Sequence, residues 1–260
     1  MKNKVALITG ASGGIGSEIA RTLANAGYDL ALTYNSNKKS VDKLIEEFKD
    51  YKIDCVGVKC DISKEDEVKN MVVKTIKKFG KIDVLVNNAG IASDHLFYDK
   101  TAEIFRNTLN VNLVGTFLVS KYVGEIMLNN KYGKIINITS TNGINTYFPM
   151  CLDYDASKAG IISLTHNLAI QYAPYVNVNA IAPGFIATEN EIKDMDEEYI
   201  ESEREKIMLK RVGREKDVAN LVKFLASDEA SYINNEVIRI DGGMYGNYWV
   251  NKWMWKRIKR

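Results

Sequence analysis

The sequence predicts an α/β fold, in which helices cover both faces of one doubly wound parallel sheet. Three observations lead to this prediction. Short apolar segments alternate with amphipathic helical segments along the chain, which is the order expected when helices connect parallel strands. The first apolar segment runs into a glycine-rich turn and then a helix. The chain has 260 residues, 46% hydrophobic and 26% charged, which fits a single well-packed domain.

The first element is a strand over 5–9, followed by the glycine-rich turn and an amphipathic helix that ends at Gly27. Glycines in this place let the backbone approach a pyrophosphate, and the helix N-terminus offers free N–H groups to it. We therefore expect a Rossmann-type dinucleotide site, with an ordinary glycine-rich turn as the alternative. The expected contacts in this turn are Gly10, Ser12, Gly14, Ile15 and Gly16.

The second strand, over 30–34, ends in a polar stretch where a dinucleotide fold reads the adenosine ribose. An acid here would bind the ribose hydroxyls of NAD, but no Asp or Glu occurs between Asp29 and Asp42. The small side chains Asn35 and Ser36, followed by two lysines, suit a 2′-phosphate better. NADP(H) is the expected cofactor, although the glycine at position 13 keeps NAD open.

The later elements continue the alternation, and two of them bear on chemistry. Ser140 follows a strand, and ligands of open parallel sheets bind beyond the carboxyl ends of strands. The acid-rich stretch 189–211 is expected to be a solvated surface helix or a lid over the substrate. The remaining strands are predicted over 54–59, 84–86, 134–139, 176–181 and 236–240, and the remaining helices over 64–79, 101–129 and 216–227.

Tyr154 and Lys158 are four residues apart, so on a helix they share one face. An ammonium held near a phenol favours the phenolate and lowers its pKa, which makes the pair a usable acid or base. By itself the spacing is a weak signal, because a tyrosine packed beside a snorkelling lysine has the same pattern.

In order along the chain, these motifs resemble the short-chain dehydrogenase/reductase family. The resemblance extends from Val5 to Gly243 and rests on the glycine pattern from Thr9, Asn-Asn-Ala-Gly at 87–90, and the side chains Asn112, Ser140, Tyr154 and Lys158. It implies that Tyr154 gives a proton to a carbonyl oxygen. Lys158 would lower the pKa of Tyr154 and hold the nicotinamide ribose, Ser140 would orient the carbonyl, and Asn112 would hold a proton-relay water.

The resemblance also implies further cofactor contacts. Asp61 would lie against the adenine, although a place near the N-cap of the next helix is an alternative reading for it. The implied set is Asp61, Ile62, Asn88, Ala89, Gly90, Tyr154, Lys158, Pro183, Gly184, Ile186 and Thr188.

Within the family, the segments 224–230 and 240–245 look most like 3-oxoacyl-acyl-carrier-protein reductases, which reduce 3-oxoacyl thioesters with NADPH in fatty-acid synthesis. Three features depart from that pattern. The loop 144–153 is longer by one residue, Tyr175 replaces a basic residue while Lys131 matches one, and the lid is acidic although the carrier protein is acidic too. A dehydrogenase of a free apolar alcohol or ketone, such as a steroid, and a cofactor-binding sensor without turnover therefore stay open.

Composition excludes several other functions. A net charge of +2 gives no general attraction for nucleic acid, and three cysteines with two histidines form no set with metal-ligand spacing. We find neither a signal peptide nor an apolar run long enough to span a membrane, so we expect a cytoplasmic enzyme acting on a small or carrier-bound acyl substrate. The family resemblance implies a homotetramer.

The chain is expected to divide into a domain over 1–245 and an aromatic and basic extension over 246–260. Trp249, Trp253 and Trp255 all fall in this extension. It could be a solvated tail, lie on an anionic membrane, or pack against a neighbouring subunit near its substrate pocket, and we favour the last.

Overall fold

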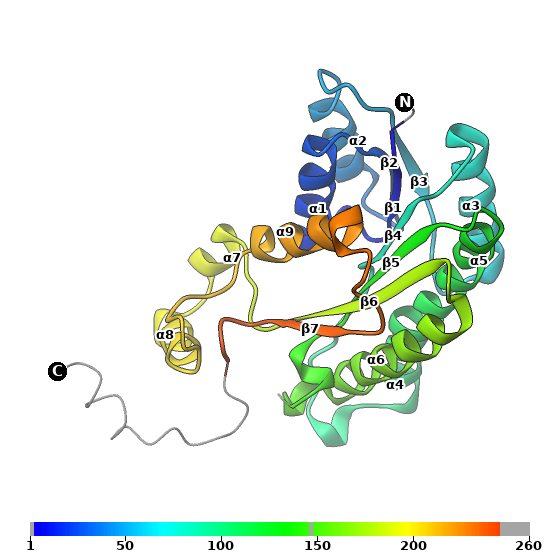
Figure 1. The fold of residues 1–260 in the computed structure, drawn as a ribbon. Coiled ribbons are helices and arrows are strands. Elements are labelled where there is room, and N and C mark those ends of the chain that lie inside the picture. Colours follow the sequence, from blue (N-terminus) through cyan, green and yellow to red (C-terminus); the bar gives the residue numbers. More distant parts are fainter. Residues whose placement is uncertain (1–2, 146–147, 245–260) are drawn as a thin grey trace.

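The computed structural model describes residues 3–145 and 148–244, and these residues form a seven-stranded parallel sheet (Figure 1). The strand order is β3-β2-β1-β4-β5-β6-β7. The predicted fold class and the predicted strand positions are confirmed, with ends that differ by one or two residues. The strands are β1 Val5–Ile8, β2 Asp29–Tyr34, β3 Cys55–Lys59, β4 Val84–Asn87, β5 Gly133–Ile138, β6 Val176–Pro183 and β7 Val237–Ile240.

The chain order reverses between β1 and β4. From β1 the chain adds β2 and β3 on one side, then returns to place β4 on the other side of β1, where Ala6 pairs with Val84. Such a reversal opens a crevice at the carboxyl ends of the two strands, which is where dinucleotides bind in folds of this class.

Alternating strand residues face two helical layers. Ala6 and Ile8 belong to a core beneath one layer, whereas Leu7 belongs to the core beneath the other. One layer holds α1 Gly14–Asn25, α2 Lys38–Glu47 and α9 Glu215–Ala226, and the other holds α3 Glu65–Phe79, α4 Ala102–Leu109, α5 Gly115–Asn129 and α6 Leu152–Tyr172 (Figure 1). Short 3₁₀ turns occur at Phe97–Asp99, Thr141–Gly143, Pro149–Cys151 and Asp228–Ala230.

The single helix predicted over 101–129 is interrupted by a π-helical turn, Asn110–Val114. Among the described residues, Ala102–Asn129 is the one helix whose length and apolar composition would suffice to cross a membrane, contrary to the expectation that no such run exists. Half of its most apolar window is nevertheless buried within the fold. Val119 and Val123, for example, pack in the core beneath α5, so the apolar character of this helix is explained by packing on the sheet.

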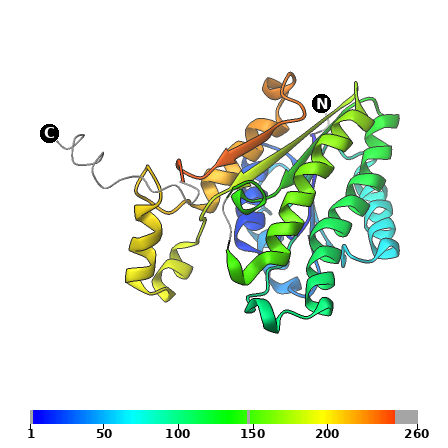
Figure 2. The ribbon, with the colours of Figure 1, turned by 90° about the horizontal axis from the view of Figure 1, so that it is seen from below.

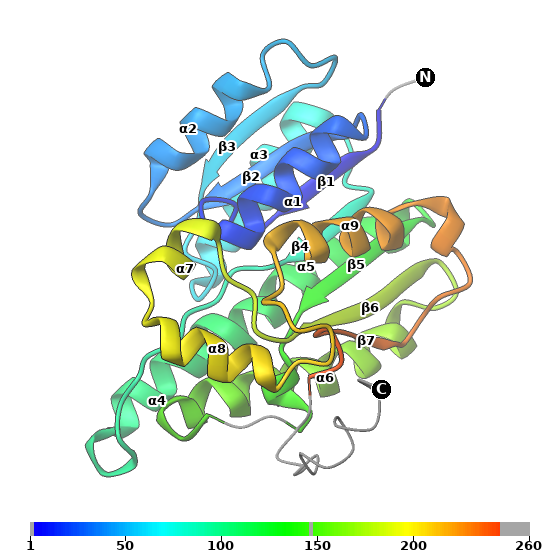
Figure 3. The same ribbon diagram turned by 90° about the vertical axis from the view of Figure 1, so that its left-hand side faces the viewer.

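The acid-rich stretch forms two short helices, α7 Glu189–Asp194 and α8 Glu197–Glu205. Both project to one side of the molecule, beyond the ends of β6 and β7 (Figures 2 and 3). Ala187, Ile200 and Val212 form a small core here that is separate from the two cores of the sheet. The extension over 246–260 lies outside the described residues.

Candidate active site

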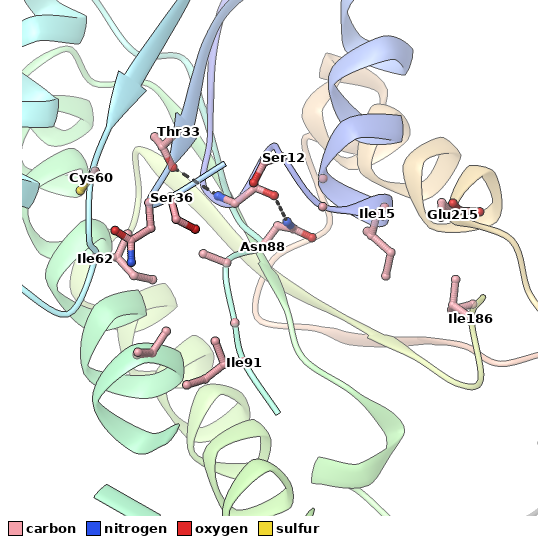
Figure 4. A pocket seen from close by; sticks show the side chains of 18 of the residues that line it. Ser12, Ile15, Thr33, Ser36, Cys60, Ile62, Asn88, Ile91, Ile186 and Glu215 are labelled. Atoms are coloured by element: carbon pink, nitrogen blue, oxygen red, sulfur yellow. Dashed lines mark hydrogen bonds between the residues drawn. The ribbon is translucent and has the colours of Figure 1, made fainter. Parts of the chain in front are cut away.

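The glycine-rich turn follows β1 and is held by residues of β2 and of the segment after β4, the strands on either side of β1 (Figure 4). The Gly10 N–H donates to the Thr33 hydroxyl at 3.2 Å, and the Asn88 amide donates to the carbonyls of Thr9 and Gly10, both at 3.1 Å. Gly10 has a φ of +65°, and a Cβ on Gly16 would lie 2.3 Å from the Gly10 carbonyl oxygen. The turn therefore requires glycine at both positions because no larger residue fits this path.

A cleft of about 460 Å³ opens above this turn, at the reversal between β1 and β4. Helix α1 begins at the cleft with Gly14, and neither a capping side chain nor an acid in the first turn competes for its N–H groups. These groups and the helix dipole suit a pyrophosphate. The residues present thus fit the dinucleotide that the sequence predicts.

Most of the predicted cofactor residues line this cleft. All those between Gly10 and Gly90 do so, as do Ile186 and Thr188. Four predicted contacts do not line it: Tyr154, Lys158, Pro183 and Gly184. Pro183 is buried at the end of β6, and the Gly184 N–H donates to the Ile240 carbonyl at 3.1 Å. The lining residues that the sequence reasoning missed are Gly13, Thr33, Cys60, Ile91, Val111, Ala187, Glu191 and Glu215.

Asp61 lies at the adenine end predicted for the cleft but does not cap a helix. The N-cap of α3 is Lys64, three residues later. The Asp61 carboxylate instead accepts from the backbone N–H and the hydroxyl of Ser63, at 3.1 and 2.7 Å. Burial alone would raise the pKa of Asp61, but these hydrogen bonds lower it below its ordinary value. The residue is thus held as a carboxylate at the rim of the cleft.

Tyr154 and Ser140 lie near each other and are not among the residues that line the cleft. Ser140 lies two residues beyond the end of β5 and is buried, and Tyr154 lies in the first turn of α6. Burial raises the pKa of Tyr154 to about 12, although a hydrogen bond with the Ser140 hydroxyl opposes this rise. The tyrosine therefore holds its proton at neutral pH, as a general acid must.

Lys158 occupies the predicted face of α6, one turn after Tyr154. Its ammonium donates to the Ile138 carbonyl at 2.9 Å and lies 5.2 Å from the centre of the Tyr154 ring. Burial lowers the pKa of Lys158 to about 8. The strand carbonyl thus holds the ammonium near the tyrosine ring, and the lowering of the tyrosine pKa by Lys158 stays a prediction.

Asn112 lies in the π-helical turn and is fully buried. Its side-chain oxygen accepts from the Ile91 N–H at 2.8 Å, and its amide donates to the Ile91 carbonyl at 2.9 Å and to the Ser157 hydroxyl at 3.0 Å. The side chain thus ties the loop after Gly90 to α6. Both amide hydrogens are used, so the predicted relay water would have to donate to an oxygen of Asn112. The side-chain oxygen accepts from Ile91 and the backbone carbonyl accepts from Thr116, and each has a second lone pair.

Lys158 and Asn112 also connect this group to the cleft. A Cβ built on Gly90, which lines the cleft, would lie 3.3 Å from the Asn112 side-chain oxygen and 3.6 Å from the Lys158 ammonium. The four predicted catalytic residues are therefore brought together next to the dinucleotide site. Among residues 3–145 and 148–244, no three His, Cys, Asp or Glu side chains gather as a metal site would require.

A dinucleotide cleft beside a protonated tyrosine is the arrangement of a nicotinamide-dependent oxidoreductase, in which a proton and a hydride must reach one carbonyl group. The comparisons with known proteins agree with this class. Residues 10–245 match the family described as enoyl-(acyl carrier protein) reductase.

Individual relatives align over nearly the whole chain. The chain is 40% identical to 3-oxoacyl-[acyl-carrier-protein] reductase FabG of Staphylococcus epidermidis, over 94% of this chain and 99% of that protein. It is 40% identical to the corresponding reductase of Synechocystis, over 93% of this chain and 96% of that one. A solved structure, a putative gluconate dehydrogenase from Agrobacterium tumefaciens, superposes with a TM-score of 0.87 at 28% identity, covering 93% of this chain and 95% of that one.

The chain belongs to the short-chain dehydrogenase/reductase family. It is an oxidoreductase that acts on CH–OH or C=O groups, and its family uses a nicotinamide cofactor.

Proposed function

We propose that this protein is a cytoplasmic, NADPH-dependent reductase that converts a 3-oxoacyl thioester into the 3-hydroxyacyl form. The observation that carries the proposal is the placement of Tyr154 beside Lys158, whose ammonium lies 5.2 Å from the centre of the tyrosine ring and close to Gly90 in the lining of the dinucleotide cleft. Relatives at about 40% identity, which carry the name of this activity, support the choice of substrate class. We propose a homotetramer of chains, each with a domain over 1–245 and an extension over 246–260.

The reaction places a hydride on the carbonyl carbon and a proton on the carbonyl oxygen. When bound, the nicotinamide cofactor supplies the hydride. Tyr154 gives the proton, and the Ser140 hydroxyl, already next to the tyrosine oxygen, is placed to donate to the same carbonyl oxygen as negative charge develops on it. Lys158, whose ammonium lies near Gly90, would hold the nicotinamide ribose.

The preference for NADPH rests on the side chains at the ribose end of the cleft. Asn35 and Ser36 line it, and both are neutral hydrogen-bonding groups that a 2′-phosphate tolerates. Lys38 is held by Asp42 at 2.7 Å, whereas Lys39 has an exposed side chain that could reach the phosphate. Three acids line the cleft: Asp61 at the predicted adenine end, and Glu191 and Glu215 elsewhere. None of them lies next to Asn35 and Ser36 in the sequence, so the proposed preference rests on the acid-free stretch that carries these two residues and Lys39.

A free apolar alcohol or ketone is the alternative substrate. It is favoured because the predicted carrier-protein contacts, Lys131 and Tyr175, lie away from the active site of the same subunit. Lys131 follows α5 and Tyr175 precedes β6, and the Lys131 ammonium lies over the Tyr175 ring at 5.8 Å. This pair therefore lies at the amino edge of the sheet, opposite the carboxyl edge that carries Tyr154. A carrier protein bound there could serve only the active site of another subunit, which ties the acyl-carrier proposal to the tetramer.

The proposal is tested by measuring oxidation of NADPH in the presence of acetoacetyl-CoA, together with a panel of free ketones and a steroid ketone. Turnover of the thioester with the highest kcat/KM supports the proposal, and a preference for a free ketone overturns it in favour of the alternative. Cofactor binding without turnover of any carbonyl would instead indicate a sensor. The variant Tyr154→Phe is the control for background oxidation.

A further inference from the structure

A buried ion pair lies beside the catalytic tyrosine, and the mechanism above does not use it. The Lys100 ammonium contacts the Asp153 carboxylate, and the exposed fractions of the two side chains are 2% and 0%. The second oxygen of Asp153 accepts from the Thr108 hydroxyl at 2.7 Å. Burial alone would raise the pKa of Asp153, but the hydrogen bonds from Lys100 and Thr108 lower it below its ordinary value. The carboxylate is therefore charged and its two oxygens are each paired.

The pair joins two segments that are far apart in the sequence. Lys100 ends the β4–α4 loop, residues 91–100, and Asp153 lies in the first turn of α6 next to Tyr154. The same ammonium also donates to the Ser93 carbonyl at 2.7 Å, within that loop. One cation thus holds both ends of the loop segment 93–100 and fastens them to the helix that carries the proton donor.

Other contacts join the same loop to the residues at the start of α6. The His95 N–H donates to the Met150 carbonyl at 3.1 Å, and the Cys151 thiol donates to the Asp94 carboxylate at 2.7 Å. At its start the loop is held through Ile91, which Asn112 ties to Ser157 on α6. The loop therefore touches the residues around Tyr154 at several points, and Lys100 is the charged contact among them that is buried.

An ion pair without access to water is a poor source of stability, because the loss of hydration offsets the attraction between its charges. What such a pair does supply is a fixed geometry. Small displacements matter here, because misplacing a reacting group by about 1 Å can cost about 10²-fold in rate.

We propose that Lys100 is a positioning residue for the reduction: its buried ammonium fastens the β4–α4 loop to the first turn of α6 and so fixes the Tyr154 hydroxyl beside Ser140. This inference rests on the proposed function for its kinetic consequence, but the fastening itself is a property of the chain alone. Asp153 is the partner through which Lys100 acts.

The test compares Lys100→Met, Asp153→Asn and the double variant Lys100→Met/Asp153→Asn with the wild type. Each single variant leaves one buried group without its partner, so both are expected to lose thermal stability. The double variant removes both charges and is expected to regain most of that stability. If Lys100 only balances charge, kcat returns along with stability in the double variant. If Lys100 positions the loop, kcat stays roughly 10- to 100-fold below wild type.

Two further measurements sharpen this comparison. The KM for the carbonyl substrate and the Kd for NADPH are expected to change by no more than about threefold. The reason is that the variant loses stabilisation of the transition state and keeps the binding of substrate and cofactor. Val123→Ala, a change in the core beneath α5, is the matched control, and it is expected to lower stability while keeping the wild-type kcat. A double variant with wild-type kcat overturns the proposal.

Hydrogen exchange of peptides covering 91–100 and 148–158 provides a readout that does not depend on turnover. Faster exchange in both peptides of the double variant, at wild-type global stability, is the expected result; unchanged exchange overturns the fastening. If the wild type reduced no carbonyl at all, the proposed function would fail, and the exchange data would still decide whether Lys100 holds the loop.

Discussion

Asp153 and Asp155 come directly before and after Tyr154 on α6, and each of them binds a different segment of the chain. Asp153 binds Lys100 and Thr108 on the side of α4. Asp155 accepts from the Asn142 amide at 2.7 Å and from the Phe148 N–H at 3.1 Å, on the side of the loop that follows Ser140. The position of the tyrosine is thus set by its two sequence neighbours, each of which fastens a different segment to α6.

The first prediction concerns the proton donor. Tyr154→Phe removes the hydroxyl and keeps the ring, so the fold and the cofactor site should change little. We expect kcat to fall by about 10²–10⁴, the usual contribution of a general acid. Steady-state kinetics with a fluorescence titration of NADPH checks this, and wild-type turnover with normal cofactor binding would show that the tyrosine is not the acid.

The second prediction concerns the contact between the Ser140 segment and α6. A Cβ on Gly143 would lie 2.6 Å from the Lys158 carbonyl carbon and 2.7 Å from the Ala159 nitrogen. Both are backbone atoms and cannot move aside, so Gly143→Ala should push the Ser140 segment away from Tyr154. We expect a loss of roughly 1–3 kcal/mol in the free energy of unfolding, measured by denaturant titration, together with a lower kcat.

A variant Gly143→Ala with wild-type stability and wild-type kcat would mean that this close approach is not needed. A loss of stability with unchanged kcat would separate the packing of the segment from the placement of its serine.

Local sequence patterns predicted much of this site. The spacing of the glycines, the ends of the strands and the Tyr154–Lys158 interval all reflect short-range geometry, and most of the predicted cofactor residues line one cleft. The fastening by Lys100 could not be predicted in this way, because it joins residues 53 positions apart and nothing near Lys100 in the sequence marks its partner. The acids on either side of Tyr154 were a signal that could have been followed.

The hydrogen-bond partner of Lys158 could not be predicted for the same reason. Four residues of helix place Lys158 near Tyr154, but whether the ammonium meets the hydroxyl depends on what else it can bond. The carbonyl of Ile138, twenty positions earlier, is within 2.9 Å and takes the hydrogen bond. Sequence spacing therefore gave the right neighbours but did not indicate this hydrogen-bond partner.

The third prediction concerns cofactor choice. Asn35→Asp would place a carboxylate at the ribose end of the cleft, where it repels a 2′-phosphate and can accept from a 2′-hydroxyl. We expect the ratio of kcat/KM for NADPH over NADH to fall by at least roughly tenfold, which corresponds to about 1.4 kcal/mol. A wild type that uses both cofactors equally, or prefers NADH, would contradict the proposed NADPH preference.

The fourth prediction concerns the extension over 246–260, which lies outside the described residues. We propose that its three tryptophans pack against a neighbouring subunit and help to close that subunit's substrate pocket. Truncation after Tyr245 should then weaken the tetramer or raise KM for the carbonyl, with the cofactor constant unchanged. Light scattering with kinetics checks this; an unaltered tetramer with unaltered kinetics indicates a solvated tail, and vesicle binding lost on truncation indicates a membrane contact.

The last prediction concerns the stability cost of Lys158. Burial lowers the pKa of its ammonium from 10.5 to about 8. Between these values the unfolded chain binds more protons than the folded one, so the free energy of unfolding rises with pH across this window and the full cost is present below pH 8.

Replacing the charged group by an apolar one of similar size removes this cost but also removes the hydrogen bond to Ile138. We expect Lys158→Met to raise the free energy of unfolding at pH 7 by roughly 2 kcal/mol, after subtracting about 1 kcal/mol for that bond. The gain should shrink as the pH rises from 8 to 10.5, while turnover is lost at every pH. Thermal unfolding at pH 7 and at pH 10 decides it: a variant less stable than wild type at pH 7 would mean that the buried ammonium stabilises the fold and is not a cost borne for catalysis.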